Sequence, residues 1–328
     1  MRQFLKDFYH IDIQNEVTVY GRNGFMDQQY LYFTIPTNDR EVIHMEQAAL
    51  AYYLYENGYE NIGIPIQNRF NEWFSQFEGK QYLVIKGKPL KNRTVPSHGQ
   101  QLAQFHEIAS SFQYEPQEIS SYGQWKTLWT DKLTAIEYRL QEKAKQQHNH
   151  YYQYLMDILP YVIGVSENAI QYMQESESEF RFNKNDQGVI SFRRYENQLT
   201  DAFMLSADFV YDHAVRDLAE YIRMNYLLEE ADNFPIIQTF LREYEQVRPL
   251  SIFSWRLLYA RLVFPIHFID SFEAGFYTED YDKLYHRLTA ICKAQSIYEQ
   301  RLGTFFHDMH IDFEKMGIPQ IDWLNSTV

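Results

Sequence analysis

The chain contains 328 residues, of which 45% are apolar and 17% aromatic, so it can bury a large core and is not expected to be disordered. A formal net charge of −14, without any Lys-rich run, excludes the clustered cations that grip the phosphate backbone of nucleic acids. The one cysteine excludes an internal disulfide, and neither the amino terminus nor the most apolar stretch, 257–269, has the pattern of a signal segment or a membrane span, so we expect a soluble protein.

The amino-terminal part of the chain has short runs rich in β-branched and aromatic residues, which predict strands. These strands are expected at 17–20, around Phe25, and at 30–35, 68–77 and 80–86, with a turn at 21–24. A helix is expected over 41–57, closed by Gly58. Gly87-Lys88-Pro89 breaks the pattern, so we expect an N-lobe over 1–87, built from an antiparallel sheet and one helix, and a C-lobe over 88–328.

The C-lobe is predicted to be mainly helical, with one interruption by strands. Helices are expected at 97–112, 122–145, 214–227, 235–244, 254–269 and 282–309, and short strands at 180–182, 189–192 and 202–205. Ser97 and Gln100 have the spacing of a capping box at the start of the first of these helices. This order of elements is typical of a bilobal, α+β, protein-kinase-like fold.

Two short motifs carry a family resemblance. Residues 99–106, GQQLAQFH, resemble the G-x-x-L-A-x-F-H helix that follows the hinge in aminoglycoside- and choline-kinase-like proteins. Residues 208–219, DFVYDHAVRDLA, resemble the segment after the metal-binding strand of that superfamily, and 180–205 lies where the superfamily keeps its catalytic loop. The whole pattern is similar to the CotS-type spore coat kinase-like proteins of endospore-forming bacteria, and within them to the YutH branch, which implies an aminoglycoside phosphotransferase-like fold.

A kinase of this fold needs a Lys on the third strand, usually held by a Glu of the following helix, to neutralise the inner phosphates of the nucleotide. No Lys occurs between Lys6 and Lys80, so the third strand has no cation to offer. Glu46 is placed to be the helix Glu, and we expect it to have no partner. The sequence therefore predicts that the lysine of a working kinase is lost.

The catalytic loop should lie near 189–199, where the resemblance implies the pattern H-x-D-x-x-x-x-N. This stretch holds no His and no Asp. The residues offered at the H-x-D position are Ser191, Phe192, Arg193 and Arg194. A cationic side chain cannot act as the general base, so only Asn197 is retained from the loop. The two arginines either bind an anion or pair with Glu196 and its neighbours.

The metal-binding Asp of the superfamily falls on Ser206 when the alignment runs through Arg216-Asp217-Leu218, and Asp208 follows two residues later. A one-residue shortening before Asp212 leaves both registers open. One carboxylate and one Asn would make a weak Mg²⁺ site. We therefore expect weak or absent binding of ATP and Mg²⁺ and predict no cofactor.

Three residues outside these positions are interpreted as structural. Asp217, with Arg216 beside it, stands at a helix start, where Asp commonly accepts from backbone N–H groups. His106 lies on an apolar helix face and is expected to be hydrogen-bonded in the core. The run 306–312, FHDMHID, has the composition of a metal site, but a solvated helix end is the simpler interpretation, and no metal is predicted.

The missing residues predict a non-catalytic, kinase-like protein (a pseudokinase) that acts by protein interaction. The resemblance implies a role in sporulation, with other spore coat or spore proteins as partners, in the spore coat or the cytoplasm of the sporulating cell. Two alternatives stay open. One is an active ATP-dependent small-molecule phosphotransferase in which Arg22 or Arg40 replaces the lysine and Asp208 holds Mg²⁺. The other is a module that binds an anionic or sugar-like ligand between the lobes, near Arg193 and Arg194.

Overall fold

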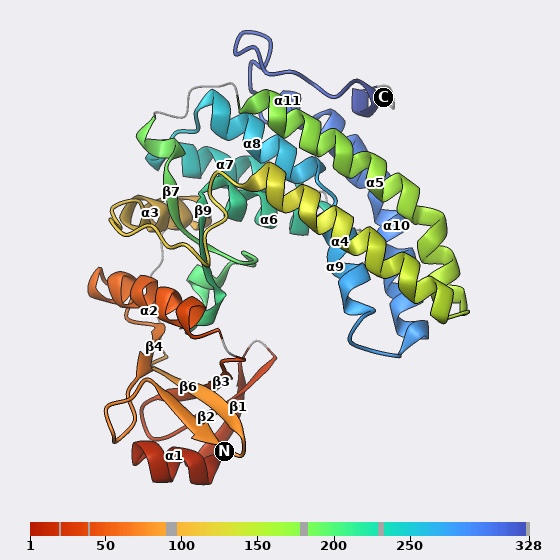
Figure 1. The fold of residues 1–328 in the computed structure, drawn as a ribbon. Coiled ribbons are helices and arrows are strands. Elements are labelled where there is room, and N and C mark those ends of the chain that lie inside the picture. The colour runs from red at the N-terminus through yellow and green to blue at the C-terminus, as the bar shows by residue number, and fades with distance from the viewer. Residues whose placement is uncertain (20, 39, 90–96, 178–182, 229–232, 326–328) are drawn as a thin grey trace. The chain divides into compact units, whose positions relative to one another are not determined.

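A computed structural model describes the chain except for residues 20, 39, 90–96, 178–182, 229–232 and 326–328 (Figure 1). The chain divides into two compact units, each made from two segments. The first unit combines Met1–Ser120 with Gly188–Ala214, and the second combines Ser121–Gln187 with Val215–Val328. The predicted lobe boundary at residue 87 stays a prediction.

The first unit contains most of the strands. Its helices are α1 (Arg2–Tyr9), α2 (Glu41–Glu56) and α3 (His98–Ala109), and its 3-10 turns are η2 (Gln198–Thr200) and η3 (Ser206–Asp208). Its strands are β1 (Asn15–Val19), β2 (Arg22–Met26), β3 (Leu31–Pro36), β4 (Ile62–Ile66), β5 (Phe74–Phe77), β6 (Lys80–Gly87), β7 (Gly188–Phe192), β8 (Met204–Leu205) and β9 (Phe209–His213).

The larger sheet has the strand order β1-β2-β3-β6-β4-β8, with β5 paired to β6 beside this path. Its pairs are antiparallel except for β4 with β8, which run parallel. The parallel pair brings the segment after β7 onto the edge of a sheet formed by the first 87 residues. A separate two-stranded sheet joins β7 to β9.

The two faces of the larger sheet have different apolar partners, because successive strand residues point to opposite faces. On one face, Phe4 and Leu5 of α1 pack with Tyr32 and Val84. On the other face, Leu31, Phe33 and Ile85 pack with Phe203 and Leu205. The second face is the one that meets β8 and the segment leading to η3.

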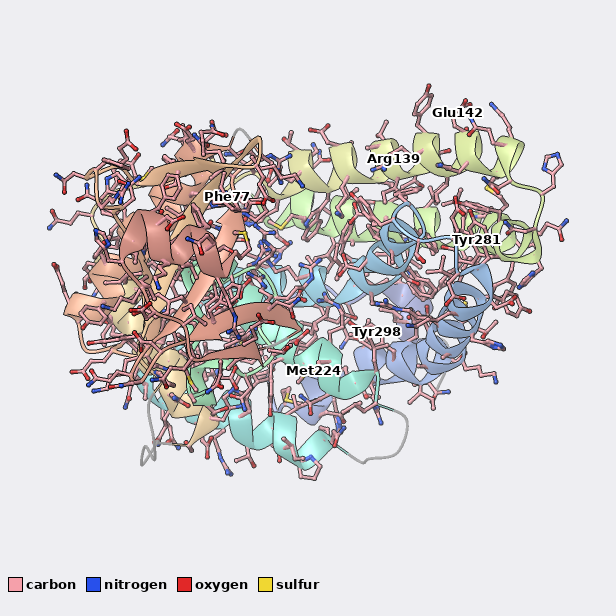
Figure 2. All side chains as sticks on the ribbon, turned by 90° about the horizontal axis from the view of Figure 1, so that it is seen from below. Phe77, Arg139, Glu142, Met224, Tyr281 and Tyr298 are labelled. Atoms are coloured by element: carbon pink, nitrogen blue, oxygen red, sulfur yellow. The ribbon has the colours of Figure 1, made fainter. Side chains whose placement is uncertain are left out.

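The second unit is helical. Its elements are α4 (Trp125–Gln146), α5 (His150–Ser176), η1 (Lys184–Asp186), α6 (Val215–Tyr226), α7 (Phe234–Val247), α8 (Ile252–Val263), α9 (Ile266–Ala274), α10 (Tyr281–Gly303), α11 (Phe305–Asp308) and α12 (Asp322–Asn325). Helices α4 and α5 lie side by side, and α5 also contacts α8 (Figure 1). Two tyrosines labelled in Figure 2, Tyr281 and Tyr298, come from opposite ends of α10; the Tyr298 hydroxyl donates to the Leu262 carbonyl of α8 at 2.6 Å.

Several sequence predictions need correction. Residues 68–73 form a loop because the Asn68 side-chain oxygen accepts from the backbone N–H of Phe70 and Glu72, so only β5 remains of the strand predicted at 68–77. Pro265 divides the helix predicted at 254–269 into α8 and α9. Helices α1 and α5 and strands β4 and β9 were not predicted. The strand expected at 180–182 lies outside the described residues.

In the described part of the chain, no single helix has the length and apolar character needed to cross a bilayer. Helices α8 and α9 reach that threshold only as a pair, and they are bent by 41° at their junction. Nearly every residue of α8 is buried within the second unit.

Candidate functional site

The eight residues predicted at degenerate kinase positions all lie in the first unit. They are Glu46 on α2, Ser191 and Phe192 on β7, Arg193, Arg194 and Asn197 in the following loop, and Ser206 and Asp208 in η3. Pairing of β7 with β9 sets Phe192 opposite Phe209, and the backbone N–H of Arg193 donates to the Asp208 carbonyl at 2.8 Å. The start of the loop and η3 therefore lie next to each other.

Glu46 has partners, contrary to the prediction. Its Oε1 accepts from the backbone N–H of Gln117 at 2.7 Å, and its Oε2 accepts from those of Glu118 at 2.9 Å and Ile119 at 3.1 Å. The side chain is buried, and hydrogen bonds to an ionised carboxylate are the stronger kind. The Glu that would hold a lysine in a kinase here holds a loop.

Gln47, the next residue of α2, makes a second connection that the sequence analysis missed. Its side-chain nitrogen donates to the carbonyls of Ala207 at 3.0 Å and Phe209 at 3.2 Å. Because these acceptors are 160 and 162 residues away, no local pattern could have revealed the contact. Adjacent residues of α2 thus fix two segments, 117–119 and 207–209.

Asp208, the candidate metal-binding carboxylate, has a cationic partner. The guanidinium of Arg22, at the start of β2, lies 2.5 Å from its Oδ1. Asp208 is 29% exposed and Arg22 42% exposed, so water screens the pair and it adds little to stability. The ion pair matters more for metal binding, because the carboxylate of Asp208, the candidate metal ligand, already faces a positive charge. Ser206, the other register of the metal-binding position, is buried.

One face of β3, the strand on which the resemblance implies a kinase lysine, packs against an aromatic ring. Here Phe33 of β3 stacks on Phe203 with ring centroids 5.5 Å apart. A Cβ atom at Gly63 or Gly87 would come within 2.7 Å or 2.2 Å of the Phe203 ring. The two glycines make room for Phe203, a residue that the sequence analysis did not single out.

The two candidate residues on β7, Ser191 and Phe192, are buried in the core. The Phe192 ring contacts those of Phe105, Tyr195 and Phe209 at centroid distances of 5.3 to 5.5 Å. Ser191 is buried, and its hydroxyl has no hydrogen-bond partner within the described residues. Position 192 therefore serves packing, which a catalytic carboxylate could not do.

Asn197 adopts a left-handed backbone conformation with φ of 74° and turns the chain into η2. Its side-chain oxygen lies 3.5 Å from the hydroxyl of Tyr195, which also forms a 2.7 Å hydrogen bond with His98. Burial lowers the pKa of His98 to about 4, so this ring is neutral at pH 7. The loop is built around aromatic and neutral polar contacts.

The two arginines of the loop lie in a region with further basic groups. Burial lowers the pKa of His44 on α2, and the nearby charges of Arg193 and Arg40 lower it further. The Arg194 guanidinium donates to the Arg193 carbonyl at 3.1 Å. The predicted pairing of the arginines with Glu196 stays a prediction.

The residues interpreted as structural are placed in both units. His106 is fully buried on α3, with its ring 5.7 Å from that of Phe105. Asp217 is fully buried in the first turn of α6, and the Arg216 guanidinium donates to the Ser121 hydroxyl at 3.2 Å. The roles assigned to these residues remain predictions.

The run 306–312 lies where α11 ends. The Asp308 carboxylate accepts from the Thr304 hydroxyl at 2.6 Å, and the His307 ring lies 3.5 Å from it. Across the described ranges, no three His, Cys, Asp or Glu side chains come close enough to hold a metal ion.

Comparison with known proteins places this chain in a family. The family model described as "Spore coat putative kinase YutH" matches residues 2–305. The chain is 34% identical over 290 residues to the endospore coat-associated protein YutH of Bacillus subtilis (strain 168), a match that covers 87% of this chain and 84% of that protein.

Solved structures show the same fold at low identity. An aminoglycoside phosphotransferase from Alicyclobacillus acidocaldarius matches with a TM-score of 0.58 and 13% identity, over 91% of this chain and 93% of its own. Amicoumacin kinase hAmiN matches with a TM-score of 0.55 and 13% identity, over 96% and 95%. The predicted bilobal, kinase-like α+β fold is confirmed.

Proposed function

This chain belongs to the YutH family of spore coat proteins and has a kinase-like fold, and from that premise we propose that it works without phosphoryl transfer, through protein interactions at the spore coat. Other spore coat or spore proteins are the partners, and the spore coat or the cytoplasm of the sporulating cell is the location. The relative from Bacillus subtilis, whose name places it at the endospore coat, supports this location.

The observation that supports the non-catalytic part is that Glu46 and Asp208, the carboxylates that the resemblance assigns to a kinase site, already have partners within the chain. Glu46 is used by three backbone N–H groups, and Asp208 by the guanidinium of Arg22. The ring of Phe203 lies against β3, where the lysine is missing. Phosphoryl transfer depends almost entirely on positioning and on neutralising phosphate charge, so partners of this kind would work against it.

The test is calorimetric titration of the purified chain with ATP and Mg²⁺, paired with thermal unfolding. No detectable heat and no shift in Tm are expected, since a ligand that binds only the folded state must stabilise it. Binding tighter than about 100 μM, roughly 5.5 kcal/mol, would contradict the proposal. Phosphate transfer abolished by Asp208→Ala would instead establish the alternative in which this carboxylate holds Mg²⁺.

A second candidate, binding of an anionic or sugar-like ligand without turnover, is favoured by one observation. Burial lowers the pKa of His44, and the charges of Arg193 and Arg40 lower it further, so basic groups from two segments, the start of α2 and the loop after β7, gather there. Inorganic phosphate should then raise the Tm of the wild-type chain but not that of Arg193→Gln. Equal shifts in both proteins would exclude this site.

A further inference from the structure

A groove of about 500 Å³ runs along one side of α2 and belongs wholly to the first unit. It is lined by Glu41, Val42, Met45, Glu46 and Ala49 of α2, by Phe74 of β5 and by Tyr114. Val42 is 60% exposed and Tyr114 54% exposed, so large apolar groups at its rim face solvent. This volume lies within the range of pockets that hold a ligand or an anchoring side chain.

The described lining carries negative charge. Within the parts of the chain that the structure describes, Glu41 and Glu46 supply its carboxylates, and no Lys or Arg lines it. The Glu41 carboxylate accepts from the side-chain amide of Gln81 at 2.7 Å, and the donors to Glu46 are backbone N–H groups. The donors to Glu46 satisfy its buried carboxylate, whereas Glu41 is exposed and has a neutral donor, so it can still attract a cation. Because the whole chain has a net charge of −14, it also attracts cationic partners over longer distances.

We propose that this groove docks a basic segment of a partner protein, which inserts one aromatic or large aliphatic side chain and sets a Lys or Arg against Glu41. The proposal rests on the proposed function, because it identifies a surface through which the chain interacts. Aromatic anchors in apolar pockets supply most of the binding energy in protein interfaces. Opposite charges at the rim add specificity and speed association.

Hydrogen bonds hold the helix that lines the groove in place. The same turn of α2 that lines it holds segment 117–119 through Glu46 and segment 207–209 through Gln47. A rigid groove loses less conformational entropy on binding than a mobile one. A segment docked here also contacts the turn that fixes residues 117–119, so their backbone amides should exchange more slowly with solvent in the complex.

The experiment measures fluorescence anisotropy of two labelled eight-residue peptides with the full chain. One peptide places Trp between Lys residues, and in the other each Lys is Glu. The basic peptide should bind, and Val42→Lys should weaken it at least tenfold while improving binding of the acidic peptide. Tyr55→Lys is the matched control, because Tyr55 is also exposed on α2 but does not line the groove; it should leave both affinities unchanged.

Three results would overturn the proposal. These are no binding of the basic peptide up to 1 mM, equal weakening by Val42→Lys and Tyr55→Lys, and a self-association of the chain, seen by sedimentation, that Val42→Lys abolishes. The last would assign the groove to a second copy. Since no nucleotide is used, failure here leaves the ATP titration to decide separately whether the chain is a kinase.

Discussion

A carboxylate as buried as that of Glu46, 6% exposed, needs donors around it, because an unpaired buried charge is costly. The lysine that supplies this need in a kinase is absent, and the backbone of 117–119 supplies it instead. Asp208 follows the same pattern, with Arg22 as its partner. The loss of the lysine can be read from the sequence, but these replacements cannot, since they join residues about 70 and 190 positions apart.

Glu46→Ala should lower the free energy of unfolding by about 2 kcal/mol or more, because it leaves one buried and two partly buried N–H groups without their acceptor. Glu46→Gln should cost less, since one oxygen acceptor remains. Urea unfolding measures the change in the free energy of unfolding, and hydrogen exchange of amides 117–119 shows whether these amides lose protection. The exposed neighbour Glu41→Ala should stay within about 0.5 kcal/mol of the wild type. A cost for Glu46→Ala no larger than that of Glu41→Ala would mean that these bonds do not stabilise the unit.

For helices and strands, the predictions succeeded where a local residue pattern determines the element. They failed where contacts with distant parts of the chain determine it. The strands at 30–35 and 80–86 and the helix at 41–57 match β3, β6 and α2 within one or two residues. Helix α5 was missed although its buried residues recur every three or four positions, because Pro160 lies inside it. The strand predicted at 202–205 is shortened to the two residues of β8, and its parallel pairing with β4 joins residues 142 positions apart (204 − 62), which no local pattern could show.

The starts of α5 and α3 test whether a capping residue in the sequence forms a capping hydrogen bond in the fold. Asn149 caps α5, its side-chain oxygen accepting from the Tyr152 N–H at 3.0 Å. Ser97 occupies the same position on α3, yet its side chain makes no capping hydrogen bond in the described structure, so the predicted capping box is not formed. Asn149→Ala should cost about 1 kcal/mol in urea unfolding, and Ser97→Ala only a few tenths. Equal costs would show that the side-chain bond is not what stabilises the start of α5.

For the whole molecule, the kinase-like fold is kept, and one face of its larger sheet packs around the ring of Phe203. The residues responsible come from distant parts of the chain: Phe33 from β3, Gly63 from β4, Gly87 from β6 and Phe203 before β8. Each is ordinary in its local sequence, so the aromatic filling could not be predicted without the fold. The absence of the lysine and of H-x-D, in contrast, was predictable residue by residue.

Because the Phe203 ring packs against Gly87, a methyl group added at Gly87 must displace the ring. The new Cβ would lie 2.2 Å from the Phe203 ring and 3.0 Å from the Gly63 Cα, so Gly87→Ala should destabilise the first unit by about 1–3 kcal/mol. Phe203→Leu, itself costly, should relieve part of this clash, giving a favourable coupling of at least about 0.5 kcal/mol in a double-mutant cycle. Gly164→Ala is the matched control, because no heavy atom lies within 4 Å of its added Cβ. Additive costs for Gly87→Ala and Phe203→Leu would mean that the glycines do not confine the ring.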